Sequence, residues 1–503
     1  MGSLDRPLHA LSALVVRHAS VFLVAGFALV AALAGVVVST GNVTAIALTI
    51  GASGGIALLG APAITVTLII IGVMVLSGPL AFYVQSLDKV PWLFAVLGLV
   101  LTGSALLHAG LQRETRRAPM PGFIVAALAF VLFALASTLW AEGPPDDSAR
   151  GLKRLLQYWG LMLALALIAF PPRTIRRWMM LIVAIALLQA PMAIYQRLVL
   201  VPSMSGAPID AVVGTLELSQ IGTGASGVLG LMQVCLIAAL LSAYRERLLG
   251  AATLIVCLVV AFIPIAFGEV NAVFLWAPIA LAVVFSDQLS RNLFRFIAGA
   301  LAAVVVIGAL GTVYLAAQQT GDGPTTPIDE RIATMIEYNV GDVGYATKDG
   351  LNRRTVWQAW WKHHGVSDPK GTLIGHGPGS AFSGDEGAGT VNRRHGGQLI
   401  DLVALTSVLW DLGLIGFGLF IAVFIGAGWR AHRLIAIAAP GLDRALARSC
   451  LAAVVLIVSS LLYNNAAVLM PSQQVFTFLV LGFVAWLDRR YRVASARPAN
   501  SAS

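Results

Sequence analysis

The sequence predicts an all-α, polytopic integral membrane protein with about fourteen transmembrane helices and one long extracytoplasmic loop that contains short helices. Three observations predict this class. Hydrophobic residues make up 58% of the 503 positions and charged residues 11%, whereas roughly a quarter of the residues in soluble domains are charged. Apolar runs of about 17 to 25 residues, the length that spans a bilayer, recur along the chain. One polar segment, at about residues 317–400, interrupts this series of apolar runs. Together these observations exclude a soluble fold.

The apolar segments divide the chain into four parts. We expect residues 1–316 to form the larger part of a transmembrane bundle, 317–400 a long outer loop, 401–488 three further spans, and 489–503 an inner tail. The first apolar stretch is long and lacks a small-residue cleavage site, so it is predicted to be retained as a span. The predicted spans are centred near Ala31, Gly51, Ile70, Leu99, Ala129, Leu163, Ala186, Met232, Val256, Trp276, Ala303, Phe417, Val455 and Phe478.

The arginine positions predict the orientation, because short cytoplasmic loops retain positive charge during insertion. Placing the N-terminus inside puts most of the 33 basic residues in inner segments. Few remain in the short outer loops, among them Lys89, Arg150, Lys153 and Arg154. Both termini are therefore expected inside and the long loop outside. The inner residues are Arg6, Arg17, Arg113, Arg116, Arg117, Arg173, Arg176, Arg177, Arg245, Arg247, Arg291, Arg295, Arg430, Arg433, Arg444, Arg448, Arg489, Arg490, Arg492 and Arg497.

The net charge of +9 follows from this distribution. A nucleic-acid partner is not expected, since the basic residues are spread over short loops and not gathered on one surface with stacking aromatics. Cys235, Cys257 and Cys450 lie in predicted spans without a CxxC or Cys/His pairing. They are predicted to pack as small apolar residues, not to form a disulfide framework or a zinc site.

Two short helices are predicted in the long loop, from Pro327 to about Tyr338 and from about Leu351 to His364. The second has an aromatic face with basic residues beside it. Such a helix suits the headgroup layer, or it packs the loop onto the bundle, and the two interpretations are compatible. The face consists of Val356, Trp357, Trp360 and Trp361, and the basic residues are Arg353, Arg354 and Lys362.

A glycine-rich turn, Gly375 to Gly379, follows these helices. Such a turn can bring backbone N–H groups close to an anion. It lacks the GxxxxGK[ST] order and follows no strand, so a nucleotide-binding P-loop is excluded. Four of the eight histidines lie in this one loop, which favours a functional role for it. They are His363, His364, His376 and His395.

Three motifs in this order resemble the O-antigen ligase and Wzy polysaccharide polymerase superfamily, which consists of polytopic GT-C-like glycosyltransferases. The motifs are "NRRTVWQAWW", "LIGHGPGSAF" and, in the next span, "LWDLGLIGFG". The positions that match are Arg353 or Arg354, Trp357, Gly375 to Gly379, Asp411 and Gly413. Upstream, "AIYQRL" followed by "VVGT" resembles the outer end of the family's Gln-containing helix and its loop. The resemblance covers about residues 186–425.

The chain departs from the family at two places. Ligases have a His-Asn pair where this chain has Asp401 and Leu402, although His395 lies only a few residues away. They also have an arginine in the outer loop two helices earlier, where this chain has "FGEVN" with Glu269. The departures favour a polymerase over a ligase.

The resemblance implies transfer of a glycan from a polyprenyl diphosphate to a hydroxyl of an acceptor glycan. Guanidinium groups bind phosphate oxygens in pairs and stay charged, so the diphosphate ligands predicted are Arg197, Arg353, Arg354 and Lys362. Contacts with the glycan or the interface are predicted for Trp357, Trp360, Trp361 and His376. Alternatively, Arg197 snorkels and Arg353 and Arg354 belong to a solvated face.

The acceptor hydroxyl needs a general base. The candidates are Glu269, His395 and Asp401, and Glu269 is slightly favoured because it sits alone between two apolar spans. Glu269 could instead pair with a loop arginine, and Asp401 could simply stabilise a helix N-terminus. The first outer loop, residues 39–42, has no carboxylate, so no metal or other cofactor is predicted.

The predicted function is a bacterial surface polysaccharide polymerase at the outer face of the inner membrane, with its long loop in the periplasm and both termini cytoplasmic. The partners implied are a polyprenyl-diphosphate-linked oligosaccharide donor, a glycan acceptor, membrane lipid, and chain-length or export proteins. One alternative is an O-antigen ligase that transfers the glycan to lipid A core. A second is a lipid-linked glycan flippase or other transporter, which is disfavoured because paired interrupted helices with midplane charges are not evident.

Overall fold

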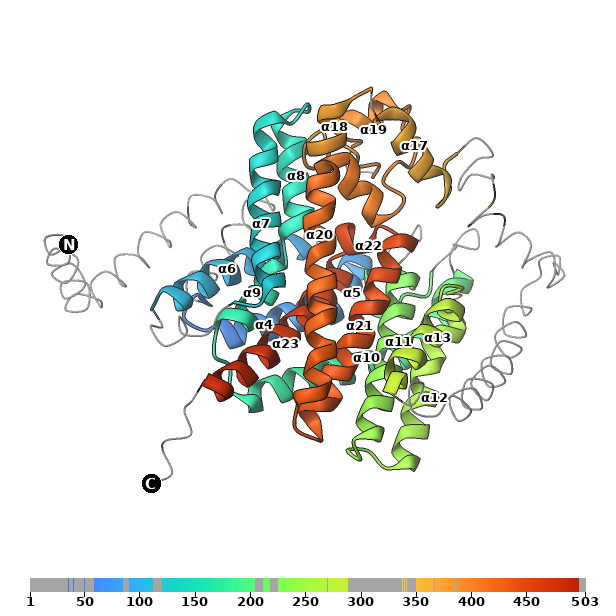
Figure 1. Ribbon diagram of the computed structural model, residues 1–503. Helices are drawn as coiled ribbons and strands as arrows, with labels where there is room; N and C mark the ends of the chain where they lie inside the picture. The colour runs from blue at the N-terminus through green and yellow to red at the C-terminus, as the bar shows by residue number, and fades with distance from the viewer. Residues whose placement is uncertain are drawn as a thin grey trace, which may run out of the picture.

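The fold is known from a computed structural model, shown in Figure 1. It describes residues 35, 39, 49, 58–84, 90–111, 120–203, 211–217, 225–268, 270–287, 337, 339, 341, 350–365, 367–384 and 387–496. Every regular element in these ranges is a helix, which confirms the all-α prediction. In the N-terminal half they are α4 (Pro62–Ile71), η1 (Gly72–Leu76), α5 (Ser77–Tyr83), α6 (Val90–Leu111), α7 (Gly122–Ala136), η4 (Ser137–Trp140), α8 (Pro145–Leu156), α9 (Trp159–Leu167), α10 (Pro172–Tyr195), η5 (Gln196–Leu200), η6 (Val201–Ser203) and α11 (Ser226–Arg245). The others are α12 (Ala251–Phe267), α13 (Val273–Val284), α17 (Thr355–His363), α18 (Pro369–Ile374), α19 (Thr390–Arg394), α20 (Ala404–Ile437), α21 (Leu442–Tyr463), α22 (Ala466–Leu469) and α23 (Pro471–Ala496).

Seven described helices are long and apolar enough to cross a membrane. They are Pro62–Tyr83, Val90–Gly110, Gly122–Trp140, Pro172–Ser203, Ser226–Arg245, Ala404–Ile437 and Leu442–Tyr463. Each contains the centre of one predicted span. The spans predicted near Val256 and Trp276 are the shorter apolar helices α12 and α13. The total of fourteen stays a prediction, since the spans centred near Ala31, Gly51 and Ala303 and the loop helix from Pro327 lie outside the described residues.

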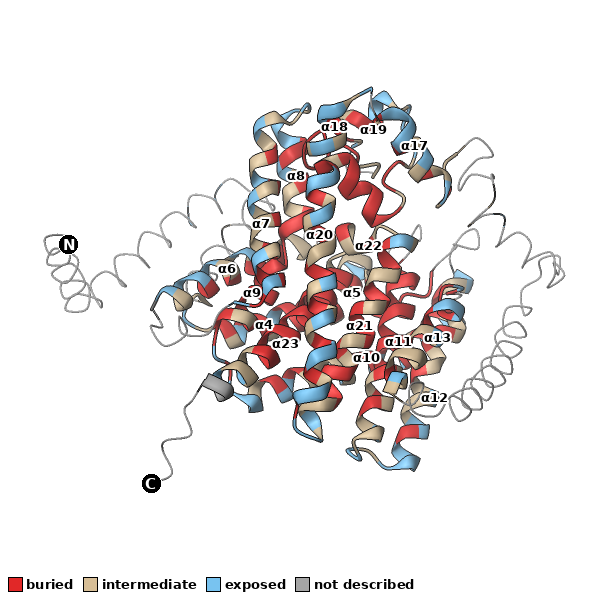
Figure 2. Ribbon diagram, in the orientation of Figure 1, coloured by how far each residue is buried: buried red, intermediate tan, exposed pale blue. Residues whose placement is uncertain are grey.

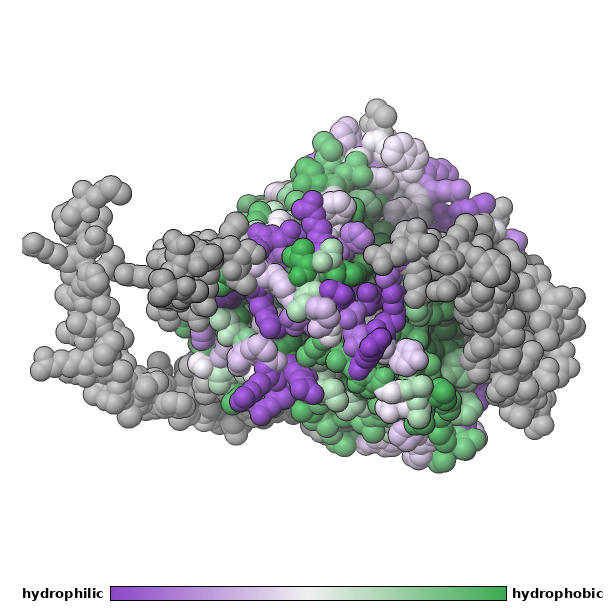
Figure 3. Space-filling view, turned by 60° about the horizontal axis from the view of Figure 1, so that its bottom comes forward, coloured by the Kyte–Doolittle hydropathy of each residue, from purple (hydrophilic) through white to green (hydrophobic). Residues whose placement is uncertain are grey.

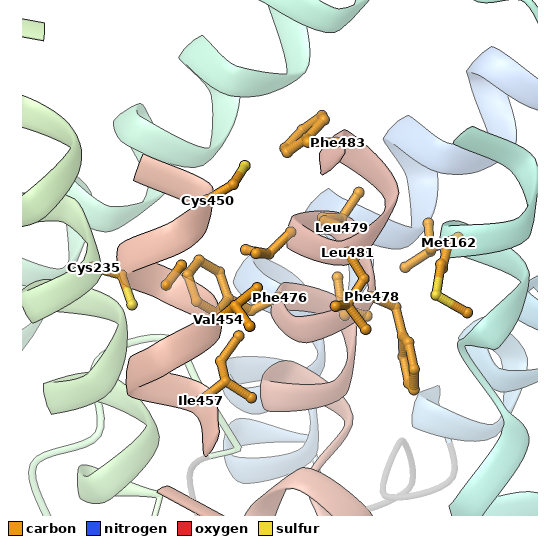
Figure 4. Packing of buried hydrophobic residues seen from close by; sticks show 14 of the residues in the cluster. Met162, Cys235, Cys450, Val454, Ile457, Phe476, Phe478, Leu479, Leu481 and Phe483 are labelled. Atoms are coloured by element: carbon orange, nitrogen blue, oxygen red, sulfur yellow. The ribbon is translucent and has the colours of Figure 1, made fainter. Parts of the chain in front are cut away.

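The core forms around α21, which packs between α20 and α11, while α23 packs against α9. Buried residues are concentrated in these central helices (Figure 2). Figure 4 shows Cys235 of α11 and Cys450 of α21 among Val454, Ile457 and Phe476. Both cysteines are buried free thiols, as predicted, whereas Cys257 is a half-buried free thiol.

The span predicted near Leu163 is not one continuous apolar helix, because α8 and α9 meet at Gln157 and Tyr158. The amide of Gln157 donates to Oε1 of Gln474 on α23 (3.0 Å), and the amide of Gln474 donates to the carbonyl of Arg154 (2.6 Å). The sequence predicted Arg154 in a short outer loop, but not that this residue is helical and buried. It lies on α8 and is only 9% exposed, since this polar helix packs into the bundle.

Ion pairs join the ends of four long helices and the segment after α13, opposite the loop helices α17–α19 (Figure 1). Hydrophilic residues gather toward the middle of this end, with apolar residues around them (Figure 3). The basic partners come from the segments that the sequence predicts as inner. The pairs are Arg245–Asp287, Arg430–Asp488, Arg448–Glu246 and Arg490–Asp443.

Candidate functional site

The glycine turn packs directly on a break in α20. The His376 amide donates to the Trp410 carbonyl (3.1 Å) and the Gly377 amide to the Asp411 carbonyl (2.9 Å). Gly375 and Gly413 have φ of +70° and +63°. A Cβ on Gly375 would lie 2.4 Å from the Asp411 oxygen, and one on Gly413 would lie 2.5 Å from the Leu373 carbonyl carbon. The "GHGPG" and "WDLG" motifs therefore form one unit that only glycine permits at these two positions.

The anion bound by this turn is the carboxylate of Asp411. The amides of Gly379 (2.8 Å) and Ala381 (2.9 Å) donate to it, as does the Ser380 hydroxyl (2.9 Å). Backbone N–H groups that converge in a turn bind anions in this way. The sequence predicted the anion-binding geometry but not that a side chain of the chain itself occupies it.

Helix α8 closes the other side of the turn. Gly151 lies so close that a Cβ there would meet the Gly379 amide nitrogen at 2.3 Å. The Arg154 guanidinium lies over the Phe382 ring, 3.3 Å from its centroid. A cavity of about 20 Å³ lies between Arg154 and Asp411, which is room for about one water molecule.

Asp401, a predicted base, lies just before α20 and is buried. Its carboxylate oxygens accept hydrogen bonds from the Ser383 amide (3.2 Å) and the Ser383 hydroxyl. Its carbonyl accepts from the Asn465 amide group (2.8 Å). Burial raises the pKa of Asp401, and the Ser383 hydrogen bonds oppose that shift. These contacts are typical of a residue that fixes two loops to each other.

The four loop histidines converge on the ring of Trp410. The ring-centroid distances from Trp410 are 4.5 Å to His364, 5.1 Å to His395, 6.1 Å to His363 and 6.3 Å to His376. His395 also lies against His363, at 4.3 Å. Burial, and then the neighbouring His363 and His376, lower the pKa of His395. It is therefore neutral near pH 7 and able to accept a proton.

One of these histidines, His376, meets two carboxylates. Nε2 of His376 lies 2.9 Å from Nε2 of His364 and 3.8 Å from Oδ2 of Asp368, and its Nδ1 lies 2.8 Å from Oε1 of Glu142. Arg394 also pairs with Glu142. Burial raises the pKa of Glu142, whereas the hydrogen bonds from His376 and Arg394 to its carboxylate lower it. The hydrogen bonds prevail, so the pKa of Glu142 lies below its usual range. Of the described residues, His364, Asp368 and His376 form the group able to hold a metal ion.

An apolar groove of about 520 Å³ lies between α17 and α20. Trp360 forms part of its wall and also stacks on His364, with 4.8 Å between ring centroids. Trp361 is 67% exposed. The groove is lined by Trp357, Gln358, Trp360, Trp361, Lys362, Leu409, Leu414 and Phe417. The three predicted tryptophans and Lys362 therefore line one groove, and the Trp360 ring contacts both this groove and His364.

The predicted diphosphate arginines occupy different settings. Nε of Arg353 donates to the carbonyl of Tyr463 (2.6 Å), Nη1 donates to Asn339 (2.7 Å), and the guanidinium lies 4.0 Å from the Tyr463 ring centroid. Arg354 is exposed at the start of α17. Arg197 lies half-buried on η5. Arg353 thus anchors the loop to the end of α21, which leaves Arg354 as the arginine of this pair that faces outward.

The two glutamines at the end of α10 bind the "VVGT" segment. Oε1 of Gln196 accepts from the amides of Val213 (3.0 Å) and Gly214 (2.8 Å), and Oε1 of Gln189 accepts from the Thr215 amide (2.8 Å). The upstream motifs that the sequence singled out are therefore in direct contact.

Sequence reasoning missed Glu217, which ends this segment. Its Oε1 accepts from the Ser472 amide (2.8 Å) at the start of α23. Its removal from water raises the pKa of Glu217 to about 7, a shift that the Ser472 hydrogen bonds oppose. No local pattern could have indicated it, because its partner Ser472 lies 255 positions away.

We expect Glu217 to make stability depend on pH. Its folded pKa exceeds its unfolded value of about 4.5, so its contribution is complete below pH ~4.5 and is lost as pH rises through about 7. Glu217→Gln should flatten the fall of Tm between these pH values in detergent. The exposed Asp146→Asn serves as control, and parallel wild-type and Glu217→Gln curves would contradict the assignment.

Glu269, the favoured base, lies outside the described residues.

Neither models of known protein families nor curated proteins match the chain.

Proposed function

We propose that the chain is a membrane glycosyltransferase that moves a glycan from a polyprenyl diphosphate to a glycan acceptor. In this proposal it acts as a polysaccharide polymerase at the periplasmic face of a bacterial inner membrane. The observation that carries the proposal is the apolar groove between α17 and α20, which shares Trp360 with the histidine cluster.

The groove suits an isoprenoid chain. Its walls are tryptophan, leucine and phenylalanine side chains, and Lys362 supplies a cation at its lining. Apolar side chains with a few placed polar groups are the usual lining of ligand sites. A polyprenyl tail in this groove brings its diphosphate to Lys362, with Arg354 at the other end of α17. In this arrangement Arg353 positions α17 through Tyr463 and does not bind phosphate itself.

His395 is the best-placed base among the described candidates. It is half-buried beside Trp410 and is neutral near pH 7, so it can take the proton of an acceptor hydroxyl. The hydroxyl oxygen then bonds to the anomeric carbon as the carbon–oxygen bond to the diphosphate breaks, and the lipid diphosphate leaves with that electron pair. Asp401 has both oxygens bound to Ser383 and acts as a positioning residue.

The test is transfer by the purified chain in bilayer discs, supplied with polyprenyl-diphosphate repeat units. Trp361→Ala should raise the KM for the donor about tenfold through loss of apolar contact. His395→Ala should lower kcat on the order of 100-fold or more. Trp429→Ala is the control for Trp361, because Trp429 is also exposed (57%) but lies on the distant part of α20.

The products distinguish the alternatives. A ladder of glycan lengths supports polymerisation, and a single transfer to lipid A core indicates a ligase. Lipid movement across sealed vesicles without a glycan product would sink the transferase proposal in favour of a flippase. Equal KM values for wild type and Trp361→Ala would overturn the groove assignment.

A further inference from the structure

We propose that His364, Asp368 and His376 bind a divalent transition-metal ion of the zinc type. The three ligands leave the fourth tetrahedral position to water, and the ion would hold α17, α18 and the glycine turn of the long loop together whether or not the chain is a transferase. It lies where α17, α18 and the glycine turn meet the segment before α8.

The hydrogen bonds fix which nitrogen of each ring carries the proton. Nδ1 of His364 lies 3.0 Å from the carbonyl oxygen of Trp360. A carbonyl oxygen only accepts, so this nitrogen must donate. Nδ1 of His376 lies 2.8 Å from the carboxylate of Glu142 and donates for the same reason. In the neutral rings both protons are therefore on Nδ1.

Both Nε2 atoms then present lone pairs to each other across 2.9 Å. Two lone pairs at this distance repel unless a cation lies between them. Two nitrogens on one tetrahedral zinc ion, each at about 2.0–2.1 Å, are roughly 3.4 Å apart. The rings need to separate by only about half an ångström to accept the ion.

The third ligand is already in place. Oδ2 of Asp368 lies 3.8 Å from Nε2 of His376, while its Oδ1 accepts from the Gly371 amide (2.9 Å). A Cβ on Gly371 would lie 2.0 Å from Oδ2 of Asp368 and 2.9 Å from Cε1 of His376. Glycine at this position therefore keeps open the space in which the carboxylate and the imidazole approach each other.

The surroundings resemble those of established metal sites. His364 is 1% exposed and His376 9% exposed, so neither is a surface histidine. Metal-binding histidines characteristically donate their other N–H to a carboxylate or a backbone carbonyl, which orients the ring and raises its basicity. Glu142 and the Trp360 carbonyl supply these two acceptors. The Asp368 carboxylate would offset one positive charge of the ion, and Glu142, which also pairs with Arg394, lies behind His376.

The experiment measures metal binding by the full chain purified without a histidine tag. After treatment with a chelator, the wild type should take up one equivalent of Zn²⁺, measured by elemental analysis, with a rise in Tm. Co²⁺ as a probe should give visible absorption bands of a four-coordinate site. Absence of uptake by folded wild type would overturn the proposal and leave a shared proton between the two rings.

Four variants locate the ion. His364→Ala and His376→Ala should lower the Co²⁺ affinity on the order of 100-fold, and Glu142→Gln about 10-fold or more, as expected for an outer-shell partner. His432→Ala, on an exposed part of α20, is the control and should bind as wild type does. If the ligand variants lose fold, Asp368→Asn keeps the Oδ1 acceptor for Gly371 and should still weaken binding. Wild-type affinity in Asp368→Asn and both histidine variants would overturn the assignment.

Discussion

Gly413→Ala is expected to destabilise the protein by roughly 2–6 kcal/mol, a large part of a typical folding free energy. Gly413 has φ +63° and ψ −168°, a conformation that essentially only glycine adopts. Its Cβ would also overlap the backbone of Leu373 and Ile374, which cannot move aside as a side chain can. Thermal unfolding in detergent should show the loss of stability.

Gly418→Ala is the matched control because it lies on the same helix. A Cβ there meets nothing within 4 Å, and alanine favours helix over glycine by about 1 kcal/mol. Its Tm should equal or exceed that of wild type. A Gly413→Ala protein as stable as Gly418→Ala would show that the glycine turn does not pack on α20 as described.

Asp411→Ala is expected to cost about 3–5 kcal/mol, because it leaves the donors of Gly379, Ser380 and Ala381 without their acceptor. Asp411→Asn should cost less, since one oxygen remains, but its NH₂ group faces a donor. Amide hydrogen exchange at Gly379 and Ala381 is the direct measurement and should accelerate in both variants.

The exposed Asp146→Ala is the control for loss of a carboxylate, and it should leave exchange at Gly379 unchanged. Slow exchange at Gly379 and Ala381 in Asp411→Ala would contradict the proposed role of the carboxylate.

The sequence predicted the helical class and the short loop helix well. The apolar period and length are local properties, so the seven long described helices each appear at a predicted centre. The loop helix expected from about Leu351 to His364 is α17, Thr355–His363, which buries Val356 and Trp360 of its predicted face but leaves Trp361 exposed.

The sequence did not predict how the site residues are arranged, because the arrangement depends on contacts between segments that are far apart in the chain. Four histidines in one loop were visible in the sequence, but Glu142, the partner of His376, lies 234 positions away from it. Helix α8 was assigned to an outer loop because its polar residues interrupt the apolar period. The buried face of α8 includes Asp147 and Arg154. It packs on Gly379 and Phe382, and the hydrophobic period of one segment cannot predict such contacts with a distant segment.

The contact of Gly151 with Gly379 also constrains biogenesis. The two residues are 379 − 151 = 228 positions apart. At about 5–20 residues per second, the glycine turn is therefore synthesised roughly 10–50 s after α8. Over that interval the side chains of Asp147 and Arg154 lack their later contacts, Arg393 and Phe382. Helix α8 therefore cannot complete its packing until the glycine turn has been synthesised.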